Sequence, residues 1–330
     1  MTEIELHAPA PQALLAIDDL HVWLGRRPQA HVVRGLSYTV APGEVVALVG
    51  ESGSGKTISA LAALGLLPPG LRVRTSGSVR LEGAELLGSS ERALRRIRGR
   101  RAGVVFQDPQ SSLDPVLTIG AQMTEAIRAH RKLPTPAARA RAVELLERVG
   151  IPAAARRLDD YPHQFSGGMR QRVLIAMALA SDPVLLIADE PTTALDVTIQ
   201  AQIVALLDEL RREQGMALVL ITHDLGLVSG FADRMVVMYS GRAVEHGAVT
   251  ELLKTPRHPY TAGLLRSVPD PTRGAEPLRP IPGAPPDLAV ELPGCPFAPR
   301  CERRLDACVT EMPPLVASGD RAVACLNPQP

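Results

Sequence analysis

The chain has few lysines and no long hydrophobic run. Its only lysines are Lys56, Lys132 and Lys254, so a lysine inside a glycine-rich loop stands out as a candidate for function. No apolar stretch approaches the ~18 residues of a membrane-spanning helix. The first residues lack the basic flank and apolar block of a secretory signal peptide. We therefore expect a soluble, cytosolic protein that reaches a membrane only through protein partners.

The sequence also lacks a strong net charge. A formal value of +1 provides no electrostatic attraction to nucleic acid or anionic lipid, and no strongly basic amphipathic segment stands out as a surface anchor. We expect no nucleic-acid partner. Hydrophobic residues at 45% and charged residues at 22% are ordinary for a globular protein. The length of 330 residues allows two domains, or one domain with an appendage.

Buried strands alternate with helices along much of the chain. Residues 43–50 read as a strand, and residues 57–67 as a helix that ends at the following prolines. Further strands are expected at 184–188, 217–221 and 235–239, with an amphipathic helix at 198–212. This alternation favours an α/β core with a parallel sheet.

Three other regions have different patterns. Strand-like segments at 16–24, 32–40 and 72–81, the last with a turn at Gly77, predict a small antiparallel sheet. Residues 113–179 are mainly helical, with helices expected at 119–130, at 137–149 and after Gly168. More than half of the prolines follow residue 255, which predicts a loop-rich appendage.

A phosphate-binding motif follows the first core strand. Residues 50–57 match the pattern G-x-x-x-x-G-K-[ST] between a strand and a helix, and they are Gly50, Glu51, Ser52, Gly53, Ser54, Gly55, Lys56 and Thr57. The glycines let backbone N–H groups curl around phosphates, Lys56 reaches the β- and γ-phosphates, and the Thr57 hydroxyl ligates magnesium. The segment predicts a nucleoside triphosphate site.

Polar residues follow three other core strands. Asp189 and Glu190 end a buried strand, where ligands of α/β proteins bind. We expect Asp189 to orient magnesium and Glu190 to act as general base toward water. Gln107 and His223 also follow strands. A lone glutamine or histidine is more often structural, but this shared position predicts that both lie near the metal and the γ-phosphate.

A second anion-binding surface is predicted at residues 166–168. Ser166, Gly167 and Gly168 precede an apolar helical run at 173–180, and paired glycines at a helix N-terminus let backbone N–H groups approach an anion. The chain already has a phosphate loop. The second surface therefore suggests two nucleotide-binding domains that face each other and complete each other's sites.

Taken in this order, these segments resemble the ATP-binding-cassette (ABC) ATPases over about residues 13–255. The resemblance implies a P-loop NTPase of ABC-cassette fold in residues 1–255, with a RecA-like parallel core, a small antiparallel β subdomain and a helical subdomain at about 109–180. It also implies ATP and Mg²⁺ as ligands, the metal being held near Thr57, Gln107 and Asp189. Residues 50–57 are then Walker A, Gln107 the Q-loop, Ser166–Met169 the signature, Asp189 and Glu190 Walker B and base, Asp196 part of the D-loop, and His223 the switch histidine.

The family stacks adenine on an aromatic residue at a position that aligns best with Leu24 here, beside Trp23. Neighbouring side chains of a strand face opposite ways, so the stacking residue stays open between these two.

The C-terminal region, residues 256–330, resembles the extension of oligopeptide and dipeptide importer ATPases, on segments 258–265 and 294–301. Nickel importers of the same branch are similar. All four cysteines lie here, and they are Cys295, Cys301, Cys308 and Cys325. Clustered thiols in a cytosolic chain suggest metal ligands, for zinc or an iron–sulfur cluster. The resemblance implies a [4Fe-4S] cluster of structural role, with zinc and unligated cysteines as alternatives.

The resemblance implies an ATP-hydrolysing subunit that powers a peptide importer from the cytoplasmic face of the cell membrane. The implied partners are a second ATPase subunit, identical or paralogous, two transmembrane permeases and an extracytoplasmic substrate-binding protein. The permease groove is expected near Gln107 and residues 111–123. Alternatives are an importer of nickel or another small solute, and an iron–sulfur assembly ATPase. A DNA-repair ATPase is disfavoured because no heptad repeat is present, and a ribosome-acting protein because only one cassette is present.

Overall fold

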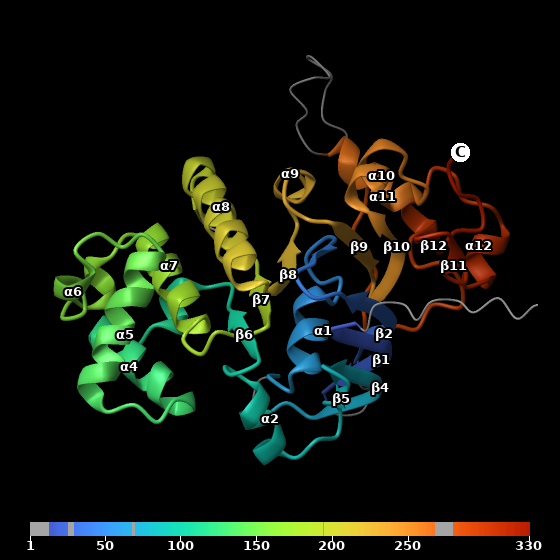
Figure 1. The fold of residues 1–330 in the computed structure, drawn as a ribbon. Coiled ribbons are helices and arrows are strands. Elements are labelled where there is room, and N and C mark those ends of the chain that lie inside the picture. The colour runs from blue at the N-terminus through green and yellow to red at the C-terminus, as the bar shows by residue number, and fades with distance from the viewer. Residues whose placement is uncertain (1–12, 26–29, 68–69, 194, 268–279) are drawn as a thin grey trace, which may run out of the picture.

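The computed structural model describes residues 13–25, 30–67, 70–193, 195–267 and 280–330, and it contains two β-sheets and a group of helices (Figure 1). The larger sheet has the strand order β11-β12-β10-β9-β3-β8-β7-β6. Its parallel strands are β3 (Val45–Val49), β6 (Ala102–Val105), β7 (Leu185–Asp189), β8 (Ala217–Thr222) and β9 (Arg234–Tyr239).

These strands are parallel because helices connect them and cover the sheet. β3, β7 and β8 are buried along their whole length, which explains their unbroken apolar sequences. Since the carboxyl ends of parallel strands lie at one edge of the sheet, the segments after β3, β6, β7 and β8 meet there. The expected α/β core is confirmed.

The smaller sheet is antiparallel and has the order β2-β1-β4-β5. Its strands are β1 (Leu15–Leu24), β2 (Ala30–Val40), β4 (Val73–Leu81) and β5 (Ala84–Glu85). Helix α1 (Lys56–Ala63) packs with this sheet and with β3 in one apolar core. The helix ends before residue 67, the end expected from the sequence.

The turn expected at Gly77 is wrong, because β4 continues through it. Gly77 has φ 100° and faces an irregularity in β1 between Asp18 and His21. A Cβ atom on Gly77 would lie 2.3 Å from the Asp19 carbonyl oxygen. The glycine thus permits a close approach of two backbones within the sheet, which is another common use of glycine in a strand.

The helices form a layer at the β6 edge of the large sheet, seen in green in Figure 1. They are α3 (Pro109–Ser112), α4 (Ile119–His130), α5 (Thr135–Arg148), α6 (Ala154–Arg157) and α7 (Gly167–Ala178), with a 3₁₀ turn η1 (Pro162–Gln164). Helix α2 (Glu91–Ile97) lies apart from them, and its Leu94 packs in the apolar core of the small sheet. Helices α4, α5 and α7 share an apolar core with α8 (Val197–Gln214) and one face of the sheet. Among the described residues, no helix has the length and hydrophobicity to cross a membrane.

The C-terminal region lies at the opposite end of the sheet (Figure 1). It follows α9 (Leu225–Ser229), β10 (Arg242–Ala248) and α10 (Val249–Lys254), and contains α11 (Pro259–Arg266), η3 (Ala298–Arg300), α12 (Ala307–Thr310), β11 (Val316–Ser318) and β12 (Arg321–Val323). Much of the region is irregular, as expected. However, β12 pairs with β10 and β11 with β12, so this region extends the large sheet, which the sequence pattern did not indicate.

Candidate nucleotide-binding site

The loop from Gly50 to Gly55 joins β3 to α1 and is enclosed by backbone from two other strands. Gly50 has φ 150° and Gly55 has φ 97°. A Cβ atom on Gly50 would lie 2.2 Å from the Met238 carbonyl oxygen, and one on Gly55 would lie 2.7 Å from that of Val32. Because no larger residue fits, the glycines at the two ends of the loop fix its tight curvature.

Lys56 reaches back across this loop. Its Nζ donates hydrogen bonds to the carbonyl oxygens of Gly50 at 2.8 Å and Glu51 at 3.0 Å, and to the Ser54 hydroxyl at 3.3 Å. Burial lowers the pKa of Lys56, while the charges of Glu190, Asp189 and Glu51 oppose this shift. A buried cation surrounded by carbonyl oxygens and carboxylates is suited to bind phosphate oxygens in their place.

Thr57 and Asp189, both expected near magnesium, contact each other. The Thr57 hydroxyl, in the first turn of α1, donates a hydrogen bond to Oδ1 of Asp189 at 2.8 Å. Burial raises the pKa of Asp189, and the neighbouring charge of Glu190 adds to this, whereas the Thr57 hydrogen bond and the charge of Lys56 lower it. Hydroxyl and carboxylate oxygens are the ligands that Mg²⁺ prefers. The pair therefore fits a magnesium ion between the loop and β7.

Glu190 follows β7 in a strained conformation with φ 44°, held by a hydrogen bond from its N–H to the Ile221 carbonyl oxygen at 2.9 Å. Its carboxylate accepts hydrogen bonds from Gln107 Nε2 at 2.8 Å and from the Thr193 hydroxyl at 2.9 Å. His223 Nδ1 lies 3.3 Å from the other carboxylate oxygen. Strain of this kind persists where surrounding contacts fix it, often at functional sites.

The structure thus joins Gln107, Glu190 and His223, three segments that the sequence placed at separate strand ends. Thr193 was missed by the sequence analysis. The sequence does contain a hint of its role, because Thr193 follows Glu190 by three residues, and a threonine hydroxyl at that spacing can form a hydrogen bond back to the turn.

Ser166, Gly167 and Gly168 form the N-terminus of α7. The Ser166 hydroxyl accepts a hydrogen bond from the Met169 N–H at 3.3 Å and caps the helix. A Cβ atom on Gly168 would lie 2.8 Å from Cγ2 of Ile199, in the first turn of α8. Gly168 therefore lets α7 pack closely on α8.

Asp196, expected in the D-loop, is the N-cap of α8. Its Oδ1 accepts a hydrogen bond from the Ile199 N–H at 2.9 Å. The roles of Ser166, Gly167, Gly168 and Asp196 toward a nucleotide stay predictions.

The two candidates for adenine stacking differ in their surroundings. Leu24 packs against the core beneath the small sheet. The Trp23 ring stacks on His31, with centroids 4.4 Å apart, and the Arg74 guanidinium lies 4.0 Å from its centroid. Trp23 is thus part of a stacked cluster on the small sheet, and the adenine contact stays a prediction.

The four cysteines are free thiols, and Cys295 and Cys301 pack against the apolar core that contains Tyr260 of α11. The Cys295 N–H donates to the Cys308 carbonyl oxygen at 2.8 Å. Burial raises the pKa of Cys295 to about 11, and negative charge on any of the other three cysteines raises it further. The thiols therefore lie within electrostatic range of one another. Within the described part of the chain, no group of three or more His, Cys, Asp or Glu side chains is placed to hold a metal ion, and the [4Fe-4S] cluster stays a prediction.

The fold and this site define a nucleotide-binding protein of the P-loop class. Residues 33–193 match the family described as "ABC transporter", and residues 244–308 match "Oligopeptide/dipeptide transporter, C-terminal region". The chain belongs to the ABC transporter family, in the branch that carries this C-terminal region.

Curated relatives agree with this assignment. The chain is 56% identical over 299 residues to the oligopeptide transport ATP-binding protein OppD of Mycobacterium tuberculosis, covering 89% of this chain and 48% of the relative. It thus spans about half the length of that protein. It is 52% identical over 295 residues to a putative peptide import ATP-binding protein of Brucella abortus, covering 89% of both chains.

Two solved structures share the fold. The cbiO1 protein of Clostridium perfringens, part of the ABC transporter complex cbiONQ, is 29% identical with a TM-score of 0.62, covering 73% of this chain and 91% of that one. The ATP-binding cassette MJ0796, as a dimer bound to ADP and phosphate, is 28% identical with a TM-score of 0.62, covering 71% and 98%.

Proposed function

We propose that this protein is the ATP-hydrolysing, energy-coupling subunit of an ABC importer for oligopeptides or dipeptides. The observation that carries the proposal is the meeting of Lys56, the Thr57–Asp189 pair and the hydrogen-bonded Glu190 at one edge of the sheet. The match of residues 244–308 to the oligopeptide/dipeptide branch supports the peptide cargo, as do the relatives named for oligopeptide transport and peptide import.

Each residue has a chemical role in this proposal. Lys56 and the loop amides bind the β- and γ-phosphates, and Thr57 and Asp189 hold Mg²⁺, which neutralises charge on the phosphates. Glu190 accepts a proton from the attacking water. Its carboxylate is oriented for this by Gln107 and Thr193. In this proposal His223, whose Nδ1 lies 3.3 Å from the Glu190 carboxylate, contacts the γ-phosphate. Phosphoryl transfer needs mainly such positioning and electrostatic stabilisation.

The proposal includes a second cassette, identical or paralogous. Helix α7 begins at Gly167, and the first N–H groups of a helix have no partner within that helix. We propose that these N–H groups bind the γ-phosphate of ATP held by the Lys56 loop of a partner cassette. The relative MJ0796 forms a dimer with ADP and phosphate, which supports this arrangement. Two permeases and an extracytoplasmic binding protein complete the assembly, with the cassettes peripheral on the cytoplasmic face of the membrane.

We further propose that Cys295, Cys301, Cys308 and Cys325 hold a [4Fe-4S] cluster that stabilises the C-terminal region. All four cysteines of the chain lie in the C-terminal region, and a charge on one thiol raises the pKa of others. Iron and sulfide analysis of anaerobically purified protein, with its electronic absorption, tests this. About four iron and four sulfide per chain are expected, with loss of both in Cys308→Ser. Protein that contains zinc, or no metal, would contradict the cluster.

Reconstitution tests the importer function. The chain is combined with candidate permeases and a binding protein in liposomes, and ATP hydrolysis is measured with and without peptide. Peptide-loaded binding protein should stimulate hydrolysis, and Glu190→Gln should nearly abolish it. Stimulation by nickel alone, or co-purification with an iron–sulfur scaffold in place of permeases, would refute the peptide-importer proposal.

A further inference from the structure

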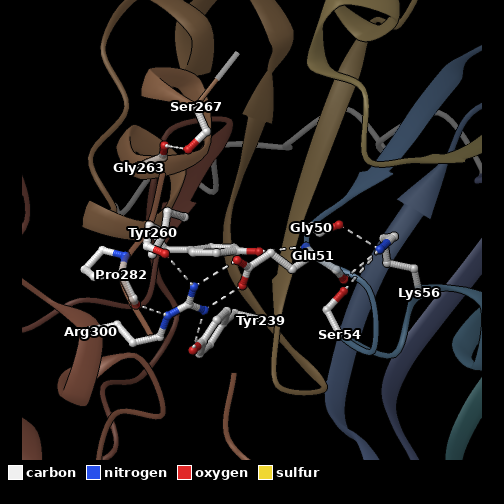
Figure 2. A network of polar contacts seen from close by, with 11 residues as sticks. Gly50, Glu51, Ser54, Lys56, Tyr239, Tyr260, Gly263, Ser267, Pro282 and Arg300 are labelled. Atoms are coloured by element: carbon white, nitrogen blue, oxygen red, sulfur yellow. Dashed lines mark hydrogen bonds and ion pairs between the residues drawn. The ribbon is translucent and has the colours of Figure 1, made fainter. Parts of the chain in front are cut away.

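The C-terminal region contacts the phosphate loop through Glu51, the second residue of that loop (Figure 2). The Glu51 backbone N–H donates a hydrogen bond to the Tyr260 hydroxyl at 2.8 Å. Its carboxylate forms two parallel hydrogen bonds with Arg300, from Nη1 to Oε2 at 2.6 Å and from Nη2 to Oε1 at 2.9 Å. Both the backbone and the side chain of Glu51 are thus held by residues of the C-terminal region.

Arg300 is fixed in its orientation by further contacts. Its Nε donates to the Pro282 carbonyl oxygen at 2.8 Å, Nη1 to the Tyr239 hydroxyl at 3.2 Å and Nη2 to the Ile281 carbonyl oxygen at 3.3 Å. With the two bonds to Glu51, these contacts use the five N–H donors that a guanidinium has. The Arg300 side chain is 5% exposed. It cannot rotate away from Glu51 without leaving several buried donors unpaired.

Three aromatic rings, those of Tyr239, Tyr260 and Phe297, pack together beside the contact between Arg300 and Glu51. The centroids of the Tyr239 and Tyr260 rings are 4.6 Å apart, and the Phe297 ring lies 5.3 Å from the first and 5.4 Å from the second. All three rings belong to the same apolar core as Val49 in β3, the strand that leads into the loop. The end of β3 and the cysteine-rich segment around Phe297 are therefore packed as one unit.

The same residue, Glu51, also contacts the site of phosphate binding. Its carbonyl oxygen accepts a hydrogen bond from Lys56 Nζ at 3.0 Å, beside the bond that Lys56 makes to Gly50. A displacement of Glu51 would therefore move acceptors that hold Lys56 in place. Preorganised loops bind more tightly because less conformational freedom is lost on binding.

We propose that Arg300 and Tyr260 are positioning residues for the phosphate loop, and that their contacts with Glu51 set the affinity for ATP. This inference rests on one part of the proposed function, which is that the loop before Lys56 binds ATP. It does not depend on what the cysteines bind. Arg300 and Tyr260 act through Glu51 and touch no reacting atom.

The test measures binding of Mg-ATP to the full chain and the kinetics of the reconstituted importer. Arg300→Gln should raise the Kd for ATP by roughly 5- to 100-fold and raise KM more than it lowers kcat. Tyr260→Phe removes one oxygen and should raise the Kd by about fivefold. If Arg300 acts through Glu51, adding Glu51→Gln to Arg300→Gln should weaken binding no further.

Arg321 offers a matched control. It is another largely buried arginine of the C-terminal region, and its ion pair with the buried Glu245, at 2.6 Å, attaches β12 to β10. Its side chain donates hydrogen bonds to Glu245 and Thr255, and neither residue belongs to the phosphate loop. Arg321→Gln should lower the thermal unfolding temperature yet keep the ATP Kd of the wild type. A purely structural role of Arg300 would make the two variants alike.

The outcomes separate the inference from the proposed function. A wild-type chain that does not bind Mg-ATP refutes the proposed function. If the wild type binds but Arg300→Gln and Tyr260→Phe bind equally well, only the inference falls. If Arg300→Gln and Arg321→Gln raise the Kd for ATP equally, the inference is also overturned. If Arg300→Gln does not fold, Tyr260→Phe decides, because it keeps the ring and its packing.

Discussion

His258 provides a quantitative test of how the C-terminal region docks on the cassette. It caps α11, where its Nδ1 accepts a hydrogen bond from the Tyr260 N–H at 3.0 Å, and only 1% of the residue is exposed. Burial lowers the pKa of His258 to about 4, and the charge of Glu245 opposes the shift only in part. The folded protein therefore holds His258 in the neutral form.

The size and sign of the pH effect follow from this shift. In the unfolded chain the pKa of histidine is about 6.5, so the folded state binds fewer protons between about pH 6.5 and 4. A difference of about 2.5 units corresponds to roughly 3 kcal/mol. This contribution to the free energy of unfolding is fully present above about pH 6.5, and it is lost progressively as the pH falls to about 4.

Denaturant unfolding of the wild type and of His258→Asn, measured from pH 4 to 7.5, tests the effect. Asparagine keeps a capping acceptor but does not titrate. The variant should lose less stability on acidification than the wild type, by roughly 3 kcal/mol over the whole range. His163→Asn replaces an exposed histidine and should follow the wild type. Parallel pH curves for the wild type and His258→Asn would refute the reasoning.

Two further substitutions test the site. Gly168→Ala should lower the free energy of unfolding by about 1–3 kcal/mol, because the new methyl group would lie 2.8 Å from Cγ2 of Ile199. Adding Ile199→Ala to Gly168→Ala should restore part of the lost stability. If the stability losses of the two substitutions simply add, the packing argument is contradicted. Thr57→Val should raise the Mg²⁺ concentration for half-maximal ATP hydrolysis by roughly 10- to 100-fold, since Thr57 and Asp189 share the proposed metal site; an unchanged magnesium titration would remove Thr57 from that site.

The phosphate loop and the acidic strand end could be predicted because their signals are local. A strand, a glycine-rich turn and a helix follow one another within residues 45–63, and the apolar β7 runs directly into Asp189. Parallel strands then bring such ends to one edge. This is why Gln107 and His223, which are uninformative alone, were expected at the same edge of the sheet as Glu190, and in the structure both side chains contact the Glu190 carboxylate.

The contacts that the sequence did not indicate join segments far apart in the chain. The pairing of Arg300 with Glu51, and of β12 with β10, depends on how an irregular region folds back on the sheet. No periodic pattern encodes such a contact. Gly77 was misread for a related reason, because a glycine that ends a strand and one that lets two backbones meet within a sheet look alike in sequence.

The central claim is that ATP binds between two cassettes. The most direct measurement is the structure of Glu190→Gln, which should hold unhydrolysed ATP, with Mg²⁺ and its partner cassette. The account predicts a γ-phosphate held by Lys56 of one subunit and by the N–H groups at Gly167 and Gly168 of the other. A complex in which ATP is bound with the start of α7 remote from every terminal phosphate would contradict it.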